Sequence, residues 1–260
     1  MTDTAVIQEH LPYTLDDVIG ARAKIGLVVL ASDYTIEHEF RQVFTVPGVD
    51  YYQARIENSN SVTPDTLADM QQRISATVQL ILPGHPLDVV AYGCTSATMV
   101  LGESVVANEI KKVQPHTKVT TPATAAFAAF DAFSAKRIAV LTPYRHDVNV
   151  LVREYMIRAG YEVPVFGSFN QESDPIVARI DEASLISAIQ SLTEKTAVDM
   201  VFVSCTSVRL LSSAAAIEQS LGIPVTSSNH ALAWHCLRLA GVDDTMSHLG
   251  RLYEQTLPVT

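Results

Sequence analysis

Short runs of apolar residues recur along the chain and alternate with amphipathic stretches. The runs over 25–30, 87–92, 137–142 and 198–203 are almost continuously apolar, which is typical of strands buried on both faces of a sheet. Over 64–82 the spacing changes, because the apolar side chains there recur every three or four residues and so form one helical face. This alternation of buried strands and helices predicts an α/β protein with parallel sheets.

The same pattern and the turn residues predict the remaining elements. Residues 1–23 read as an acidic arm with at most one helical turn, begun by Thr14 as its N-cap. Further strands are expected over 49–56, 118–121, 162–166 and 224–226. Helices are expected over 36–43, 64–82, 99–113, 124–133, 148–159, 185–192, 210–221 and 231–240.

The second half of the chain repeats the order of the first. Ile25 and Cys94 are 69 positions apart, and Ile138 and Cys205 are 67 apart. We therefore expect two similar Rossmann-like domains with parallel sheets, related by a pseudo-twofold axis, and a site in the cleft between them, beyond the carboxyl ends of the strands. The predicted division is an arm over 1–23, domains over 24–121 and 122–230, and a C-terminal helix over 231–260 that returns to pack on both.

Composition and charge narrow the classes of function. The chain is 48% hydrophobic with a net charge of −10, so it lacks the basic surface that nucleic acids require. Its apolar runs are too short to span a bilayer, and its first twenty residues contain no Lys or Arg, unlike a signal peptide. Three cysteines do not form a disulfide framework. We expect a cytoplasmic protein with free thiols, no nucleic-acid partner and no membrane.

Two of the cysteines occupy equivalent places in the repeat. Cys94 and Cys205 each begin a Cys-Thr-Ser tripeptide, placed between a buried strand and an expected helix start. Unpaired N–H groups and the helix dipole at such a place bind carboxylates and lower a thiol pKa. One such cysteine usually serves packing, but a matched pair indicates chemistry on two faces of one ligand. Cys236 lies inside the last helix and is expected to pack.

The segments Tyr92–Ala97 and Val203–Ser207 resemble the two signature loops of the aspartate/glutamate racemase superfamily. Within it the chain is most similar to the group of maleate cis–trans isomerases, arylmalonate decarboxylases and ectoine-utilisation proteins. Further matches bring the resemblance to about residues 24–245, and they lie in 24–37, 142–144, 174–185 and 231–241.

The resemblance implies a cofactor-free isomerase or racemase that works at the α-carbon of a small carboxylic acid. By the same matching, Cys94 is the nucleophile or base and Cys205 the opposing acid. The carboxylate is then held by the hydroxyls of Thr95, Ser96, Thr206, Ser207 and Tyr144. No metal site is expected, because no zinc or phosphate-loop motif is present. A homo-oligomer, either a dimer or a tetramer, is expected, with the helical surface and the acidic arm as the parts able to support it.

Two departures from the pattern bear on the substrate. Maleate isomerases carry Asn where this chain has Asp33, and again near Asp174. Ionised aspartates repel a second carboxylate, so an amino-acid-like or ectoine-derived substrate is favoured over maleate if both line the cleft. The alternative for either residue is that it caps a helix.

Two other functions remain open at this point. An arylmalonate-type decarboxylase of the same superfamily keeps only the second cysteine and has glycine at the first position, which Cys94 disfavours. A non-catalytic protein that binds a small carboxylate in the same cleft needs neither thiol.

Overall fold

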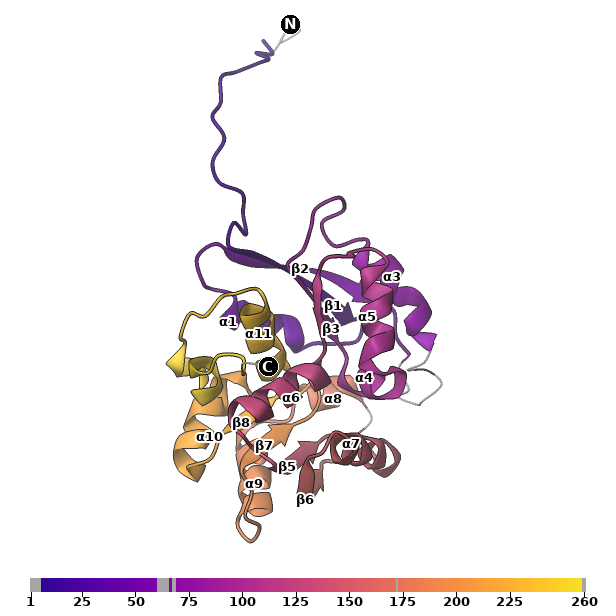
Figure 1. The fold of residues 1–260 in the computed structure, drawn as a ribbon, viewed down its shortest axis with the longest axis vertical. Coiled ribbons are helices and arrows are strands. Elements are labelled where there is room, and N and C mark those ends of the chain that lie inside the picture. The colour runs from indigo at the N-terminus through magenta and orange to yellow at the C-terminus, as the bar shows by residue number, and fades with distance from the viewer. Residues whose placement is uncertain (1–5, 60–65, 67–68, 172, 259–260) are drawn as a thin grey trace, which may run out of the picture.

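Two four-stranded parallel sheets, one from each half of the chain, form the framework of the computed structural model (Figure 1). The structure describes residues 6–59, 66, 69–171 and 173–258. The first sheet has the order β2-β1-β3-β4 and the second β6-β5-β7-β8, so the two halves share one topology. The strands are β1 (Ala23–Leu30), β2 (Val49–Ile56), β3 (Val89–Gly93), β4 (Lys118–Thr120), β5 (Arg137–Thr142), β6 (Glu162–Ser168), β7 (Met200–Val203) and β8 (Val225–Ser227).

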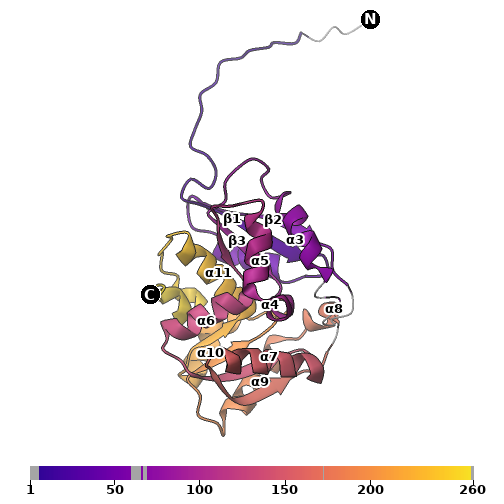
Figure 2. The same cartoon turned by 45° about the vertical axis from the view of Figure 1, so that its right-hand side comes forward.

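Helices cover both faces of each sheet (Figures 1 and 2). Four of them, α1 (Ile36–Val43), α6 (Pro122–Ala132), α7 (His146–Arg158) and α11 (Ser228–Leu239), contribute buried side chains to a core shared by both halves. The others are α3 (Gln71–Val78), α4 (Thr95–Leu101), α5 (Glu103–Lys111), α8 (Asp174–Val177), α9 (Glu182–Thr193) and α10 (Ala214–Leu221), with the 3-10 turns η1 (Leu211–Ser213), η2 (Ser247–Leu249) and η3 (Arg251–Glu254).

The alternation of side chains along each strand creates three apolar cores. Leu27 and Val29 of β1 face the shared core, in which Trp234 of α11 is fully buried, whereas Val28 faces an outer core with α3 and α5. A third core lies under α9 and α10 on the second sheet. Because one core joins the inner faces of both sheets, the two halves are held together as a single packed unit.

The predicted fold class and all eight strands are confirmed, with ends that differ by at most two residues. The helix expected over 99–113 is instead two helices, α4 and α5, separated by Gly102 with φ +87°. A positive φ at this glycine breaks the helix without steric cost. The helix expected over 64–82 is ordered as α3 over its second part, and part of its first portion lies outside the described residues.

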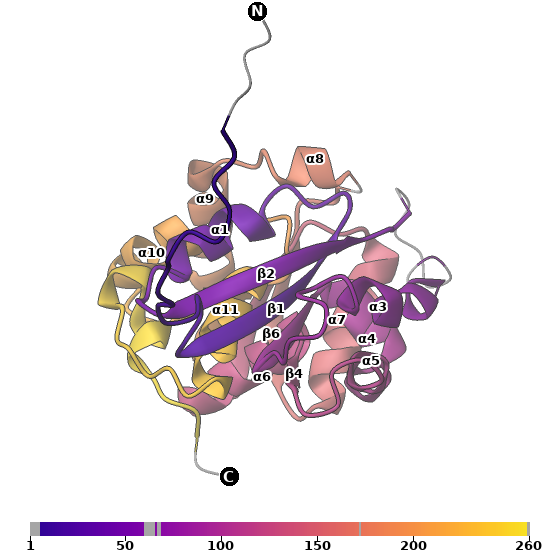
Figure 3. The same ribbon diagram turned by 90° about the horizontal axis from the view of Figure 1, so that it is seen from above.

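The N-terminal arm is seen in Figures 1 and 3 to leave the body of the molecule. The helical turn expected at Thr14 is wrong, because no helix is present over the described part of the arm. Leu11, Leu15 and Ile19 are 63%, 88% and 74% exposed. Among the described residues, no helix combines the length and apolar character that a bilayer crossing needs.

Candidate active site

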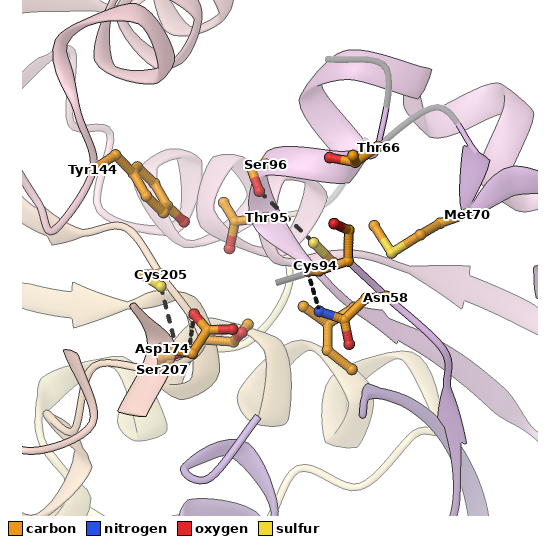
Figure 4. Close-up of a pocket in the computed structure, with 13 residues that line it drawn as sticks. Asn58, Thr66, Met70, Cys94, Thr95, Ser96, Tyr144, Asp174, Cys205 and Ser207 are labelled. Carbon is orange, nitrogen blue, oxygen red and sulfur yellow. Dashed lines mark hydrogen bonds between the residues drawn. The ribbon is translucent and has the colours of Figure 1, made fainter. Parts of the chain in front are cut away.

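Both Cys-Thr-Ser loops open onto one buried cavity between the halves. Figure 4 shows Cys94 from the first half and Cys205 from the second on different sides of this cavity. The space open to the centre of a water molecule is ≈ 30 Å³. The cavity is lined by Leu30, Asn58, Ser59, Thr66, Met70, Cys94, Thr95, Ser96, Tyr144, Asp174, Cys205, Thr206 and Ser207.

The structure therefore gathers eight of the nine predicted site residues around one cavity; Asp33 is the exception. The side chains come from the carboxyl ends of strands in both sheets, as the parallel topology predicts.

The Cys94 loop is organised by its own helix. Cys94 is the N-cap of α4, and its Sγ accepts a hydrogen bond of 3.4 Å from the N–H of Ala97. The Thr98 hydroxyl donates to the Cys94 carbonyl at 2.7 Å. Just before it, Gly93 has no room for a side chain, since a Cβ atom there would lie 2.9 Å from both the Ile36 side chain and the Val28 carbonyl. Glycine thus allows the strand to deliver Cys94 directly to the cavity.

The Cys205 loop has no such helix. Residues 204–210 form a turn and α10 begins only at Ala214, so the predicted helix start beside Cys205 is wrong. The Cys205 Sγ accepts from the N–H of Ser207 at 3.4 Å. Two carbonyls of this loop are held by groups outside it: Thr35 Oγ1 donates to Ser207 O at 2.8 Å, and Asn229 Nδ2 donates to Thr206 O at 2.7 Å.

Burial controls the protonation of both thiols. It raises the pKa of Cys94 to about 11 and that of Cys205 to about 12. The charge of Asp174 raises both pKa values further, while nearby N–H donors lower them. The predicted lowering of the thiol pKa by a helix dipole is therefore wrong, because α4 has only seven residues, Cys205 caps no helix, and desolvation of a thiolate dominates.

The Tyr144 side chain interacts electrostatically with both Cys94 and Cys205. Its ring is packed against both the shared core and the outer core of the second sheet, and its hydroxyl lies close enough to Cys205 to stabilise the thiolate and lower the Cys205 pKa. Burial and the nearby thiols raise the pKa of Tyr144 well above its ordinary value. The hydroxyl therefore stays protonated and can donate to an anion in the cavity (Figure 4).

Asp174 gives one wall of the cavity an acceptor character. Its Oδ1 accepts from the Ser207 hydroxyl at 3.0 Å and its Oδ2 from the Ser32 hydroxyl at 2.6 Å. Ser32 Oγ in turn accepts from Asn58 Nδ2 at 2.9 Å. Because the hydroxyl protons of Ser32 and Ser207 already point at Asp174, the oxygens on this wall can accept hydrogen bonds from a ligand but have no proton left to donate.

Asp33 lies beside the cavity and not in its lining. Its Oδ1 accepts from the N–H groups of Thr35 and Ile36 at 2.7 and 2.8 Å. It therefore binds the first N–H of α1, as the capping alternative expects, although the N-cap residue of α1 is Thr35 and not Asp33. Its Oδ2 is buried and accepts no hydrogen bond from the described residues, although Thr206 is near enough to lower the Asp33 pKa. Burial dominates and raises that pKa to about 6.

Sequence reasoning missed several residues that line or support the cavity. Asn58 and Met70 line it, and only the position of Asn58 just past the end of β2 offered a signal. Glu39 was missed as well. It is 2% exposed and accepts hydrogen bonds of 2.8 Å from the N–H groups of Leu210 and Leu211. Nothing in the sequence links these residues, which are more than 170 positions apart.

Comparisons with known proteins agree with this architecture. The sequence model of the arylmalonate decarboxylase family matches residues 25–253. The chain is 28% identical over 250 residues to the maleate isomerase of Nocardia farcinica (strain IFM 10152), which covers 91% of this chain and 98% of the relative.

Two solved structures of maleate isomerases are similar as well. A cysteine-to-serine mutant of the Nocardia farcinica maleate cis–trans isomerase with a covalently bound succinylcysteine intermediate superposes with a TM-score of 0.79, at 26% identity over 89% of this chain and 98% of that one. A variant of the maleate isomerase Iso from Pseudomonas putida S16 with maleate gives a TM-score of 0.83 at 24% identity, over 90% of this chain and 98% of that one, which supports the fold.

The chain belongs to the arylmalonate decarboxylase family. The predicted resemblance is thereby confirmed. The protein is an enzyme of the maleate isomerase and arylmalonate decarboxylase type, and its relatives support an isomerase.

Proposed function

We propose that this member of the family is a cofactor-independent isomerase that acts on a small carboxylic acid through Cys94 and Cys205. The observation that carries the proposal is the meeting of both sulfurs and the Tyr144 hydroxyl at one buried cavity. The covalent succinylcysteine in the Nocardia relative supports a cysteine-based mechanism in this fold.

The raised thiol pKa values determine how such a pair would work. Both thiols are protonated at rest near pH 7, so Cys205 has a proton to donate to the substrate. Cys94 first gives its proton to a solvent base, and the thiolate so formed is a strong base and nucleophile, which suits attack at a carbon centre.

In a racemisation the Cys94 thiolate takes the α-proton and Cys205 gives its proton to the opposite face, which leaves Cys94 as the thiol and Cys205 as the thiolate. In a double-bond isomerisation the Cys94 thiolate adds to one alkene carbon as the π bond breaks and Cys205 protonates the other carbon. After rotation about the C–C single bond, the Cys205 thiolate takes that proton back and the C–S bond breaks, which restores the Cys94 thiolate.

The substrate carboxylate is assigned to the donor side of the cavity. Tyr144 has a hydroxyl proton to offer there, beside the hydroxyls of Thr95, Ser96 and Thr206. Hydrogen bonds to the carboxylate oxygens stabilise the enediolate charge that develops when an α-proton leaves. Ser207 directs its hydroxyl proton at Asp174, so its role is to orient that carboxylate.

The acceptor side of the cavity defines the rest of the substrate. Asp174 lines it and the unpartnered Oδ2 of Asp33 lies close by. A second substrate carboxylate at this wall would meet a like charge at short range. We therefore assign a substrate with a hydrogen-bond donor or a cation opposite its carboxylate, such as an amino-acid-like or ectoine-derived acid, in preference to maleate.

Proton NMR in D₂O on a substrate panel tests both the proposed isomerase activity and the proposed substrate class. The panel contains maleate, aspartate, glutamate, diaminobutyrate, N-acetyldiaminobutyrate and an arylmalonate. We expect loss of an α-proton signal from one of the amino acids, and no such loss with Cys94→Ser or Cys205→Ser. Fumarate formation from maleate would keep the isomerase and overturn the assigned substrate class.

Asp174→Asn provides the matched variant for the substrate class. The amide is isosteric and removes the negative charge, so turnover of dicarboxylates should rise relative to that of donor-bearing acids by about tenfold.

Two other outcomes of the substrate panel would identify a different function. Release of carbon dioxide from the arylmalonate would identify a decarboxylase. Ligand binding without turnover, unchanged in both serine variants, would identify a binding protein.

A further inference from the structure

We infer that Glu39 is a positioning residue for the Cys205 loop, defined here as residues 204–210. Its carboxylate, which belongs to α1 in the first half, holds the backbone of this loop and of the turn that follows it in the second half. The inference rests on the proposed role of Cys205, and its test separates the two.

The contacts form one chain from α1 to the cavity. Glu39 Oε1 accepts from the N–H groups of Leu210 and Leu211, both at 2.8 Å. Glu39 Oε2 accepts from Asn229 Nδ2 at 2.8 Å, and the same amide donates to Thr206 O at 2.7 Å. Glu39 thus fixes the end of the loop directly and, through Asn229, the residue next to Cys205.

An ionised carboxylate suits this place better than any neutral side chain. Three N–H donors converge on two oxygens of a side chain that is 2% exposed, and hydrogen bonds to a charged acceptor are about twice as strong as neutral ones. No cation among the described residues forms an ion pair with Glu39. The backbone donors at the loop end therefore supply the compensation for the buried charge.

Through Asn229, the position of the Cys205 loop depends on whether Glu39 is ionised. Its Oδ1 is buried and accepts no hydrogen bond from the described residues. If Glu39 carries a proton or is replaced by an amide, it offers a donor toward Asn229, and the Asn229 amide has to rotate to present Oδ1. The rotated amide no longer donates to Thr206 O, so the Cys205 loop loses one of the hydrogen bonds that hold it from outside.

The surroundings place this switch near neutral pH. Burial raises the pKa of Glu39 to about 7, against the effect of its hydrogen bonds and with a contribution from Asp33. Below that pH Glu39 gains its proton, so the loop should loosen as the solution is acidified. The other titratable or charged groups around it are Asp33, Tyr253, His38, Glu182 and Arg209.

Glu39→Gln is compared with Glu218→Gln. Glu218 is 4% exposed and also accepts from two backbone N–H groups, but these belong to Val225 of β8 and Arg251 of η3 and not to the Cys205 loop. Iodoacetamide labelling of Cys205 and Cys94 is followed by mass spectrometry, and kcat and KM are measured from pH 6 to 9. Glu39→Gln should change the Cys205-to-Cys94 labelling ratio at least fivefold and lower kcat about tenfold, with KM within threefold.

The pH profile separates positioning from simple structural loss. The activity of the wild type should fall as the pH is lowered below 7, and the activity of Glu39→Gln should not show this acidic limb of the pH profile. Glu218→Gln should keep both the limb and the wild-type labelling ratio. If the labelling ratio, kcat and pH profile of Glu39→Gln match those of Glu218→Gln, the inference is overturned.

Asn229→Ala keeps the test decisive if Glu39→Gln does not fold. It removes the donor to Thr206 O and should shift the labelling ratio in the same direction, and the double variant should add little to either change. An unchanged ratio in Asn229→Ala would contradict the inference. A shifted ratio in an enzyme that turns over none of the panel would retain the positioning role and reject the proposed function.

Discussion

The two loops share the tripeptide Cys-Thr-Ser and occupy equivalent places in the repeat, yet they are held in different ways. Cys94 caps α4 and receives its bonds from Ala97 and Thr98, which are its own neighbours in the chain. Cys205 caps nothing, and its loop is held by Thr35, Glu39 and Asn229 from elsewhere in the fold. A sequence repeat thus predicts where the thiols lie but not what supports them.

The largest expected effect tests whether the two loops act as a pair. Cys94→Ser and Cys205→Ser should each lower kcat by roughly 10³-fold or more, because each removes a reacting group. Cys236→Ala is the control, since Cys236 is a buried thiol of α11 outside the cavity lining, and its kcat should stay within about twofold. A large loss in only one serine variant would mean that a single thiol carries the chemistry.

The pH dependence of thiol reactivity should sharpen the comparison. Because the pKa is about 11 for Cys94 and about 12 for Cys205, the thiolate fraction of each rises roughly tenfold per pH unit up to pH 10. Iodoacetamide labelling between pH 7 and 10 should follow this slope, with Cys94 ahead of Cys205. A plateau near pH 7 would instead show a lowered thiol pKa.

A smaller effect, on the free energy of unfolding, should distinguish the structural roles of Cys94 and Cys205. Cys94→Ala removes the N-cap acceptor of α4, whereas Cys94→Ser keeps one, so the alanine variant should be less stable than the serine variant by about 0.5–1 kcal/mol. At Cys205 the Sγ accepts from the N–H of Ser207 but caps no helix, so this difference between alanine and serine should be smaller. Urea denaturation of the four variants measures both differences.

The smallest effect is expected from the N-terminal arm. Removing residues 2–19 keeps the ion pair between Arg22 and Asp244, with a distance of 2.5 Å, and removes no residue of the cavity lining. Both kcat and the free energy of unfolding should therefore stay close to the wild-type values, within about 0.5 kcal/mol for the latter. A substantial loss of activity would show that the arm supports one of the loops.

Local pattern explains why so much of the fold could be predicted. Continuous apolar runs such as 25–30 are typical of buried strands, and Gly93 and Cys94 follow one of them directly. The carboxyl ends of parallel strands meet at one edge, which is why Thr95, Ser96, Thr206 and Ser207 were predicted correctly to lie together. The separation of α4 from α5 at Gly102 escaped prediction, because one glycine inside a helical pattern does not by itself indicate a break.

The sequence by itself determined the α/β class, the internal repeat, the strand order along the chain and the meeting of Cys94 with Cys205. Each of these follows from side-chain periodicity and from the geometry of parallel sheets, which act over a few residues at a time. Only the tertiary structure decided the protonation of the thiols, the capping role of Asp33 and the contact of Glu39 with the Cys205 loop. These depend on burial and on contacts between residues far apart in the chain, and no local pattern encodes either.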